Sequence, residues 1–234
     1  MKHPHLKGAK VALVAMGRSH LNYSMSLCNS FEYDEVWGIN AMAIPFKVDR
    51  LFMMDPVTRF LDMDVTGKMT GGMRKILTEK QPYPIYSSTT DERCPSVEQY
   101  PLEEVISATG LCYFNNTVPY ALGYALYQEV GEIFIYGVDY TYSDMRVAEP
   151  GRACTEFWCA ILAKSGVKLQ IAPESSLLDT NVPPTQKMYG YHLLPDPLYV
   201  DFSNNDEVTI SKVSNIMRPP TPGDSEDLPE VRKA

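Results

Sequence analysis

Three short apolar runs, each ending in glycine or a polar residue, limit what this chain can fold into more than any other feature. They cover residues 11–17, 35–40 and 49–55. Continuous apolar runs of this length are typical of strands that are buried on both faces of a parallel sheet. The polar, cap-forming residues after the first run predict a helix from Arg18 toward Phe31. A strand, a glycine turn and a helix make the first half of a βαβ unit.

The same alternation returns in the second half of the chain. Apolar residues keep helical spacing over 117–130, and strand patterns follow at 132–139 and 167–172, with a helix over 155–164 between them. Between the two halves, glycines, prolines and a polar run predict a loop-rich insertion around a strand near Ile85. Strands and helices that alternate at this spacing predict an α/β fold with a Rossmann-like, doubly wound, mostly parallel sheet.

The C-terminal part of the chain differs from the rest in amino-acid composition. Prolines recur beyond Asp179, and the end of the chain is rich in charge. We therefore expect a sheet domain over residues 1–180, a proline-rich wrapping extension over 181–217 and a disordered tail over 218–234.

Composition argues against several classes of protein. The 234 residues include 21 Lys and Arg against 29 Asp and Glu, a net charge of −8, which argues against an extended basic surface for nucleic acid. No run approaches the ~20 apolar residues of a membrane span, and the start has no apolar leader segment, so we expect a cytoplasmic protein. The five cysteines are odd in number and lack CxxC spacing, which argues against a disulfide scaffold and a structural zinc module.

Polar residues at the ends of the predicted strands form the candidate site. The carboxyl ends of parallel strands meet at one edge of a sheet, where ligands bind. The residues expected there are Gly17, Arg18, Ser19, Asn40 and Asp55. Backbone N–H groups, a guanidinium and a hydroxyl at a helix start suit an anionic phosphate. The turn has neither a GxGxxG nor a GxxxxGK[ST] pattern, and Ser19 equally fits a helix N-cap.

Each of the other candidates also has a structural alternative. Asn40 is suited to a base or a ribose, or to neighbouring backbone groups. Asp55 is suited to a metal ion or a sugar hydroxyl, or to capping the helix predicted just after it. Asp139, followed by Tyr140 and Tyr142, is suited to gripping a polar ring, although tyrosines also anchor loops.

Several stretches stand in the order in which a known family has its motifs. They are AMGRSHL at 15–21, GIN at 38–40, LFMMDP at 51–56, ALYQEVGEIFIYGVDY at 125–140 and APESSLL at 172–178. In this order they resemble the GNGPSL-type turn, the strand ends and the closing CPNSLL motif of the bacterial sialyltransferases that modify lipooligosaccharide. More distantly, they resemble the motility-accessory-factor flagellin glycosyltransferases and the pterin diphosphokinases. The resemblance spans roughly residues 10–179, a domain of ordinary size.

The resemblance implies a nucleotide-sugar-binding domain over residues 1–180 and a glycosyltransferase-like enzyme that transfers the sugar to an unidentified acceptor, a viral or bacterial DNA or glycan. It implies nucleotide-binding roles for Gly17, Arg18, Ser19, Asn40, Asn116 and Thr117. It implies that Asp139, Tyr140 and Tyr142 face the phosphate and the sugar as catalytic residues.

The chain departs from the family pattern where the chemistry is most demanding. The family's general-base histidine should fall after the tyrosine loop, yet residues 144–155 contain no histidine. Such a base typically contributes ~10²–10⁴-fold to the rate, so another residue must activate the acceptor if the sugar is transferred. The candidates from the sequence are Glu149, Asp144 and His20.

Two other functions remain open. One is a non-catalytic nucleotide-binding protein with the same fold, because nothing is turned over without a base. The other is a pyrophosphoryl-transfer enzyme that uses Mg²⁺ or Mn²⁺, for which Asp55 and Asp139 are the candidate ligands. The expected partners are a nucleotide or nucleotide-sugar and an unidentified acceptor, and an oligomer is compatible with the sequence.

Overall fold

The computed structural model describes residues 2–63, 70–183, 186–204 and 207–217 of the chain. These residues belong to two compact units, one ending at Thr180 and the other beginning at Asn181. The predicted tail at 218–234 lies outside the described residues, and the wrapping role of 181–217 stays a prediction.

The first unit is built on a seven-stranded sheet with the strand order β5-β4-β3-β2-β1-β6-β7. All six neighbouring pairs are parallel. The strands are β1 (Lys10–Val14), β2 (Glu35–Ile39), β3 (Arg50–Phe52), β4 (Ile85–Ser87), β5 (Val97–Gln99), β6 (Glu132–Tyr136) and β7 (Lys168–Ile171). The chain moves outward from β1 to β5 and then returns to the other side of β1. The strand order therefore reverses between β1 and β6, where doubly wound sheets bind their ligands.

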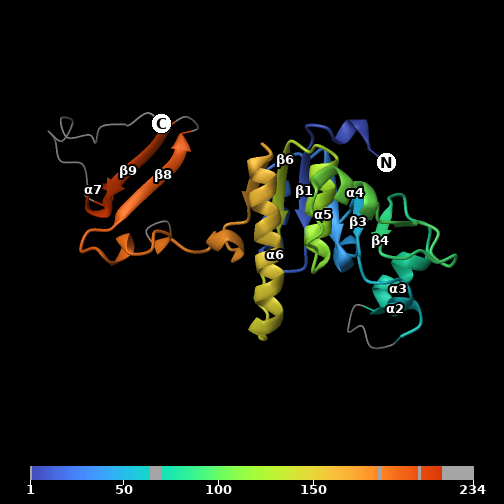
Figure 1. Cartoon of the computed structure of the whole chain (residues 1–234). Coiled ribbons are helices and arrows are strands. Elements are labelled where there is room, and N and C mark those ends of the chain that lie inside the picture. The colour runs from blue at the N-terminus through green and yellow to red at the C-terminus, as the bar shows by residue number, and fades with distance from the viewer. Residues whose placement is uncertain (1, 64–69, 184–185, 205–206, 218–234) are drawn as a thin grey trace. The chain divides into compact units, whose positions relative to one another are not determined.

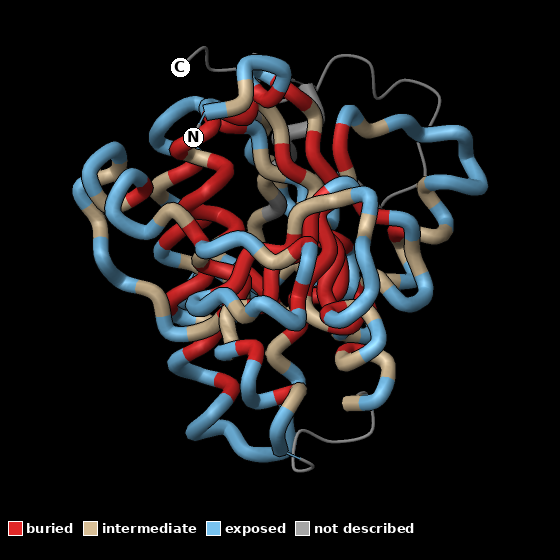
Figure 2. Tube along the Cα trace, turned by 90° about the vertical axis from the view of Figure 1, so that its right-hand side faces the viewer, coloured by how far each residue is buried: buried red, intermediate tan, exposed pale blue. Residues whose placement is uncertain are grey.

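Helices cover both faces of this sheet, and buried residues gather along the strands and the inner helix faces (Figure 2). Figure 1 shows α4 (Leu102–Thr109), α5 (Thr117–Tyr127) and α6 (Met145–Lys164) along one face. On the other face, α1 (Leu21–Cys28) buries Tyr23 against β1 and β6. The short helices α2 (Thr58–Leu61) and α3 (Thr70–Thr78) pack with β3 and β4. The predicted α/β, doubly wound parallel fold is confirmed.

The helix α6 is twice as long as the predicted helix over 155–164, with 20 residues from Met145. Pro150 and the glycine after it make this stretch look like a loop in sequence, because proline removes a helical N–H donor. Asp144 caps the helix, since its carboxylate accepts a hydrogen bond from the Arg146 N–H at 3.0 Å. The helix therefore begins before the proline and carries it internally.

The region predicted to be a loop-rich insertion contains more regular structure than expected. The strand near Ile85 is present as β4, and β5 and α3 lie on either side of it in the sequence. Both β4 and β5 have only three residues, too few for a clear alternating pattern.

A buried ion pair holds the amino ends of β2 and β3. The Arg50 Nε atom lies 2.7 Å from Glu35 Oε2, and both side chains are less than a tenth exposed. Trp37 and His5 also bind the Glu35 carboxylate, at 2.6 and 2.7 Å. Burial alone would raise the pKa of Glu35, but the hydrogen bonds from Arg50, His5 and Trp37 hold that pKa below its usual value. This network lies at the end of the sheet opposite to the strand ends predicted to bind a ligand.

The second unit contains the antiparallel pair β8 (Leu198–Asn204) and β9 (Glu207–Lys212), followed by the short helix α7 (Val213–Met217). A 3₁₀ turn at Tyr191–Leu193 precedes them. Within the described ranges of the chain, no helix has both the length and the apolar content of a membrane span. The cytoplasmic location stays a prediction.

Candidate functional site

A cleft of about 1120 Å³ opens at the carboxyl ends of β1, β2, β3 and β6. It lies at the reversal of the strand order, and the first turns of α5 and α6 contribute to its wall. Nine of the predicted site residues line it: Gly17, Arg18, Asn40, Asp55, Asn116, Thr117, Asp139, Tyr140 and Tyr142. Two predicted residues, Ser19 and Glu149, are outside its lining. The chain thus brings together residues that are more than 120 positions apart in sequence.

Two glycines allow the loops after β1 and β6 to touch. The Gly17 N–H donates a hydrogen bond to the Gly137 carbonyl oxygen at 2.7 Å. A Cβ at position 17 would lie 2.6 Å from that oxygen and from Asp139 Oδ2. Gly137 has a φ of +70°, and a Cβ there would lie 2.0 Å from the Ala15 carbonyl oxygen. Only glycine fits either position without moving the backbone.

Ser19 and Asp139 form a buried bridge between the same two loops. The Ser19 N–H donates to Asp139 Oδ2 at 2.7 Å, and the Ser19 hydroxyl donates to Asp139 Oδ1. That hydroxyl also accepts a hydrogen bond from the Gly137 N–H at 2.9 Å. The two residues are only 2% and 4% exposed. Each carboxylate oxygen of Asp139 thus binds a donor from the turn after β1, so Asp139 joins the loops after β1 and β6.

Asn40 carries the least satisfied polar group of the site. Its side-chain Oδ1 atom is buried and has no hydrogen-bond partner in the described part of the structure. The residue lines the cleft and adopts a φ of 52°, a left-handed conformation that asparagine tolerates better than most residues. A buried polar atom without a partner costs about 1–3 kcal/mol. A polar ligand group in the cleft would remove that cost.

Two arginines stand at the cleft, and one of them has no counter-charge. Arg18 is exposed and makes no ion pair or side-chain hydrogen bond with the described residues. Arg146, on the first turn of α6, lies 3.2 Å from Asp144 and its side chain is 91% exposed. A guanidinium at the cleft is chemically suited to an anionic group, and the role of Arg18 as a ligand contact stays a prediction.

Tyr140 is an internal anchor, whereas Tyr142 is exposed. The Tyr140 hydroxyl donates to Asn116 Oδ1 at 3.2 Å and also contacts the Thr155 hydroxyl. Asn116 in turn caps α5 by accepting from the Val118 N–H at 3.1 Å. Burial raises the pKa of Tyr140 well above its usual value. Tyr142 is 59% exposed, so its hydroxyl is the one that remains free for a ligand.

The cleft offers few acids and bases. Asp55 and Asp139 are the acidic residues among the described lining, and no histidine is present there. One oxygen of Asp55 pairs with Arg59, and the other has no partner among the described residues. Glu149 is exposed on α6, and Asp144 caps that helix. Of these carboxylates, Asp55 is therefore the one that combines a free oxygen with a place in the cleft.

His20 does not reach the cleft lining either. Its Nδ1 atom lies 2.8 Å from the Gly17 carbonyl oxygen, which can only accept, so Nδ1 carries the proton. The imidazole thus closes the turn after β1.

Among the described residues, no three His, Cys, Asp or Glu side chains gather in a way that could hold a metal ion. Asp55, predicted as a metal ligand, pairs one carboxylate oxygen with Arg59, and its role as a metal ligand stays a prediction.

Sequence reasoning missed three residues that shape the site: Gly137, Thr155 and Arg146. Of these three, Gly137 has a signal in the sequence, since it lies between a predicted strand and Asp139. A glycine at such a position often marks a close approach of two backbone segments. Arg146 lies in the part of α6 that precedes the predicted helix over 155–164. Thr155 is the first residue of that predicted helix, and its contact with Tyr140 has no signal in the sequence.

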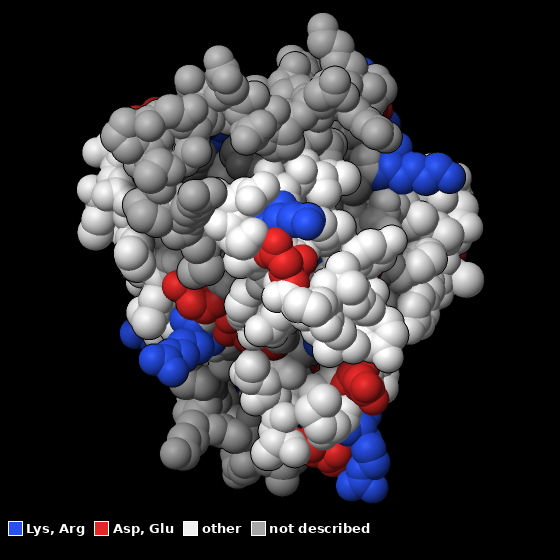
Figure 3. Space-filling model, turned by 90° about the vertical axis from the view of Figure 1, so that its left-hand side faces the viewer, with Lys and Arg blue, Asp and Glu red and all other residues white. Residues whose placement is uncertain are grey.

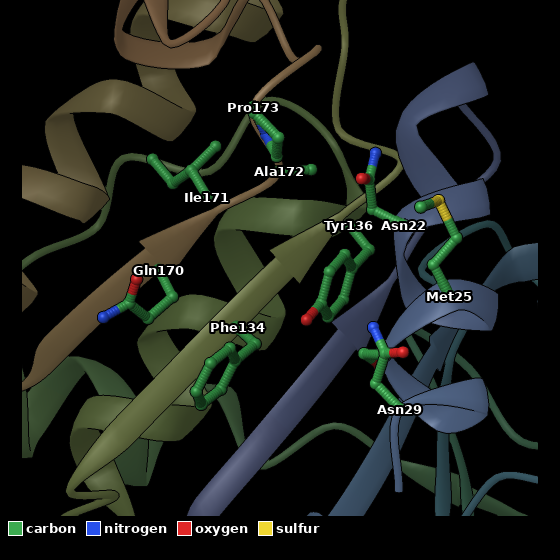
Figure 4. A pocket seen from close by; sticks show the side chains of 10 residues that line it. Asn22, Met25, Asn29, Phe134, Tyr136, Gln170, Ile171, Ala172 and Pro173 are labelled. Atoms are coloured by element: carbon green, nitrogen blue, oxygen red, sulfur yellow. The ribbon is translucent and has the colours of Figure 1, made fainter. Parts of the chain in front are cut away.

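A second, smaller hollow of about 330 Å³ lies on the opposite face of the sheet, between α1 and the strands β6 and β7 (Figure 4). Met25 and Asn22 come from α1, Phe134 and Tyr136 from β6, and Gln170 from β7. Its lining contains no charged side chain. This hollow therefore offers neither a phosphate-binding cation nor a proton acceptor of catalytic strength.

No family model matches the chain, and no curated protein matches its sequence. Among solved structures, a mutant of the α-2,3/8-sialyltransferase CstII is 16% identical over 72% of this chain and 84% of its own, with a TM-score of 0.47. The Campylobacter jejuni sialyltransferase CstII in complex with the substrate analogue CMP-3FNeuAc is 15% identical over 71% and 81%, with a TM-score of 0.46.

Proposed function

We propose that this protein is a glycosyltransferase-like enzyme that binds a nucleotide-sugar in the large cleft and transfers the sugar to an acceptor hydroxyl. The observation that carries the proposal is the buried side-chain oxygen of Asn40, which has no partner among the described residues, in a cleft that Arg18 also lines. A polar ring beside a phosphate satisfies both groups at once. A nucleotide has this combination.

The residues divide into those that contact the ligand and those that hold the cleft in shape. Arg18 and Arg146 bind the phosphate, and Asn40 reads the nucleoside. Ser19 and Asp139 position the two loops, because their polar atoms already bind each other. The sequence predicted that Ser19 binds the nucleotide and that Asp139 is catalytic. In this proposal both residues instead hold the cleft in shape.

The transfer step requires a proton acceptor, and Asp55 fits that role best. The acceptor oxygen attacks the anomeric carbon, and the bond between that carbon and the phosphate oxygen breaks. The leaving phosphate takes the bonding electrons, and its charge is stabilised by Arg18. The proton of the acceptor hydroxyl passes to the free carboxylate oxygen of Asp55. Glu149, the base considered from the sequence, is outside the lining of the cleft.

The acceptor is not identified by this cleft. On the face that Figure 3 shows, the described acidic and basic side chains are interspersed and form no large basic patch. The net charge of −8 favours a glycan acceptor over DNA.

A nucleotide-binding protein without turnover is the second candidate function. It is favoured by the absence of histidine from the described cleft lining. A magnesium-dependent pyrophosphoryl transfer is not favoured, because Asp55 and Asp139 are the only carboxylates among the described residues that line the cleft, and such a transfer needs several.

Binding is tested by calorimetric titration with cytidine, uridine and guanosine monophosphates, diphosphates and sugar conjugates. We expect one of these classes to bind, and Arg18→Gln to weaken it ~10–150-fold, the loss of one charge-assisted hydrogen bond. The matched control is Arg93→Gln, because Arg93 is about half exposed and lies outside the cleft. The proposal fails if no nucleotide binds, or if both variants bind equally well.

Turnover is tested by following the release of the nucleotide from the ligand that binds. Asp55→Asn should lower that release ~10²–10⁴-fold while leaving the dissociation constant nearly unchanged. If the wild-type protein binds the ligand but releases no nucleotide from it, the transferase proposal is wrong. The second candidate, a nucleotide-binding protein without turnover, then remains. Full release in Asp55→Asn would remove the assigned base.

A further inference from the structure

The smaller hollow between α1 and the strands β6 and β7 (Figure 4) is lined by amide side chains. Asn22 and Asn29 are seven residues apart, so they lie on one side of α1, about 10 Å from each other along the helix axis. Gln170, on β7, is the register partner of Phe134 on β6 and lines the same hollow. The side chains of Asn29 and Gln170 make no hydrogen bond with the described residues. The hollow therefore holds donors and acceptors that the described part of the chain does not use.

Asn22 is held in an orientation that leaves its side-chain oxygen available. Its Nδ2 atom donates to a carboxylate oxygen of Glu174 and lies 3.4 Å from the Ser19 carbonyl oxygen. No donor among the described residues binds its Oδ1 atom. One end of the hollow thus offers an acceptor, and the other end offers the whole amide of Asn29.

The wall opposite α1 is aromatic and fixed by its neighbours. Phe134 is half-buried, and the rings of Phe31 and Tyr33 pack against it with centroid distances of 5.0 and 5.3 Å. The hydroxyls of Tyr33 and Tyr136 bind each other at 2.7 Å. Ala172 lines the hollow with only a methyl group, which leaves space open beside these rings. The aromatic wall is therefore in place before any ligand binds.

We propose that this hollow binds a neutral saccharide. Each hydroxyl of a sugar both donates and accepts hydrogen bonds, and an amide side chain offers both kinds of partner. The C–H groups of a sugar ring pack against aromatic rings, whose faces carry partial negative charge. The volume of about 330 Å³ lies at the lower end of the range for small-molecule pockets, which suits a short saccharide. This site is separate from the large cleft, and the proposal does not rest on nucleotide binding there.

Other occupants would leave part of the lining unsatisfied. A phosphate or a carboxylate would find no Lys or Arg among the described residues that line the hollow. An apolar side chain of a partner protein would remove water from the amides of Asn29 and Gln170 without replacing its hydrogen bonds. A neutral ligand with several hydroxyls satisfies the amides and covers the aromatic wall at the same time.

The test is a ¹H–¹⁵N NMR titration of the full-length protein, without nucleotide, with the methyl glycosides of glucose, galactose, mannose and N-acetylglucosamine. The variants are Asn29→Ala and Gln170→Ala, because both side chains are exposed and neither is needed inside a core. The matched control is Gln99→Ala, since Gln99 is an exposed amide on β5, at the other edge of the same sheet. Circular dichroism and thermal unfolding check that each variant is folded.

We expect at least one of these sugars to shift the side-chain amide signals of Asn29 and Gln170 with a single, millimolar dissociation constant. Each of the two alanine variants should raise that constant about 2–10-fold, the loss of one neutral hydrogen bond, and Gln99→Ala should leave it unchanged. The proposal is overturned if no sugar shifts these signals, or if Gln99→Ala weakens binding as strongly. It is also overturned if the sugars shift only the amide signals of Asn40 and Asn116, which line the large cleft.

Phenol, titrated separately, serves as an apolar probe. If phenol shifts the signals of the hollow and no sugar does, the hollow takes an apolar group and the saccharide assignment is wrong. Because no nucleotide is present in these titrations, their failure leaves the proposed function of the large cleft unaffected.

Discussion

Replacing Ser19 with alanine removes one hydroxyl that joins the two sides of the strand-order reversal. The Asp139 carboxylate loses one of its donors, and the Gly137 N–H loses its acceptor. Both effects occur where the residues are almost fully buried, so water does not replace the lost bonds. A hydrogen bond to a charged group is worth about 1.5–3 kcal/mol, and an unsatisfied buried donor costs about 1–3 kcal/mol. Since the two losses share one atom, we expect a combined loss of about 3 kcal/mol rather than their full sum.

Urea unfolding followed by circular dichroism measures this loss directly. In a unit of this length, about 3 kcal/mol corresponds to a fall of ~6–12 °C in the melting temperature. The control is Ser143→Ala, because Ser143 is exposed, and we expect that variant to lie within about 0.5 kcal/mol of the wild type. The reasoning is refuted if Ser19→Ala changes stability as little as Ser143→Ala does. If Ser19→Ala abolishes nucleotide binding at unchanged stability, Ser19 contacts the ligand, as the family resemblance implied.

Four further predictions follow from the same contacts. Glu35→Ala leaves Arg50 buried without its partner and should cost about 3–5 kcal/mol in urea unfolding. Because the pKa of Glu35 is lower in the folded state, its contribution to stability is present above its ordinary pKa and is lost as pH falls through the folded pKa. The acid-induced fall in stability should thus be shallower in Glu35→Gln, and an unchanged pH profile would contradict the assignment. Tyr140→Phe should lower the melting temperature and leave the nucleotide affinity unchanged. Tyr142→Phe should leave the melting temperature unchanged and lower the nucleotide affinity. If both variants change stability and affinity by the same amounts, the two tyrosines do not have separate roles. Gly17→Ala should lower stability by at least ~1–3 kcal/mol, because its Cβ would meet backbone and a buried carboxylate, and a wild-type unfolding midpoint would be inconsistent with that contact. A chelator should not change nucleotide affinity, and a loss on chelation that added Mg²⁺ restores would show a metal site that the described residues do not form.

The sequence predicted the sheet and the place of the site because both depend on local patterns. Each central strand is an apolar run bounded by a glycine or a polar residue, and the parallel order brings those boundaries to one edge. Gly17, Asn40 and Asp55 were placed correctly in the cleft for this reason. Their specific roles as ligand contacts stay predictions.

Other features of the site depend on interactions that no local pattern carries. Asp139 looks like an available carboxylate in sequence, and its partner Ser19 is 120 positions away. Pro150 makes the first turns of α6 look like a loop in the sequence. The only local sign that the helix starts earlier is its N-cap, Asp144. Asn40 gives no sign in sequence that its amide lacks a partner, since that depends on everything packed around it.

We propose that the cleft at the strand-order reversal binds a nucleotide through the Asn40 side chain and the turn after β1. Two-dimensional ¹H–¹⁵N NMR of the protein during titration with the nucleotide that binds follows both groups at once. We predict that the side-chain amide signals of Asn40 and the backbone amide of Arg18 shift together, with the same dissociation constant as in calorimetry. If these signals stay fixed while residues elsewhere in the chain shift, the ligand lies at another site and the assignment of the cleft is wrong.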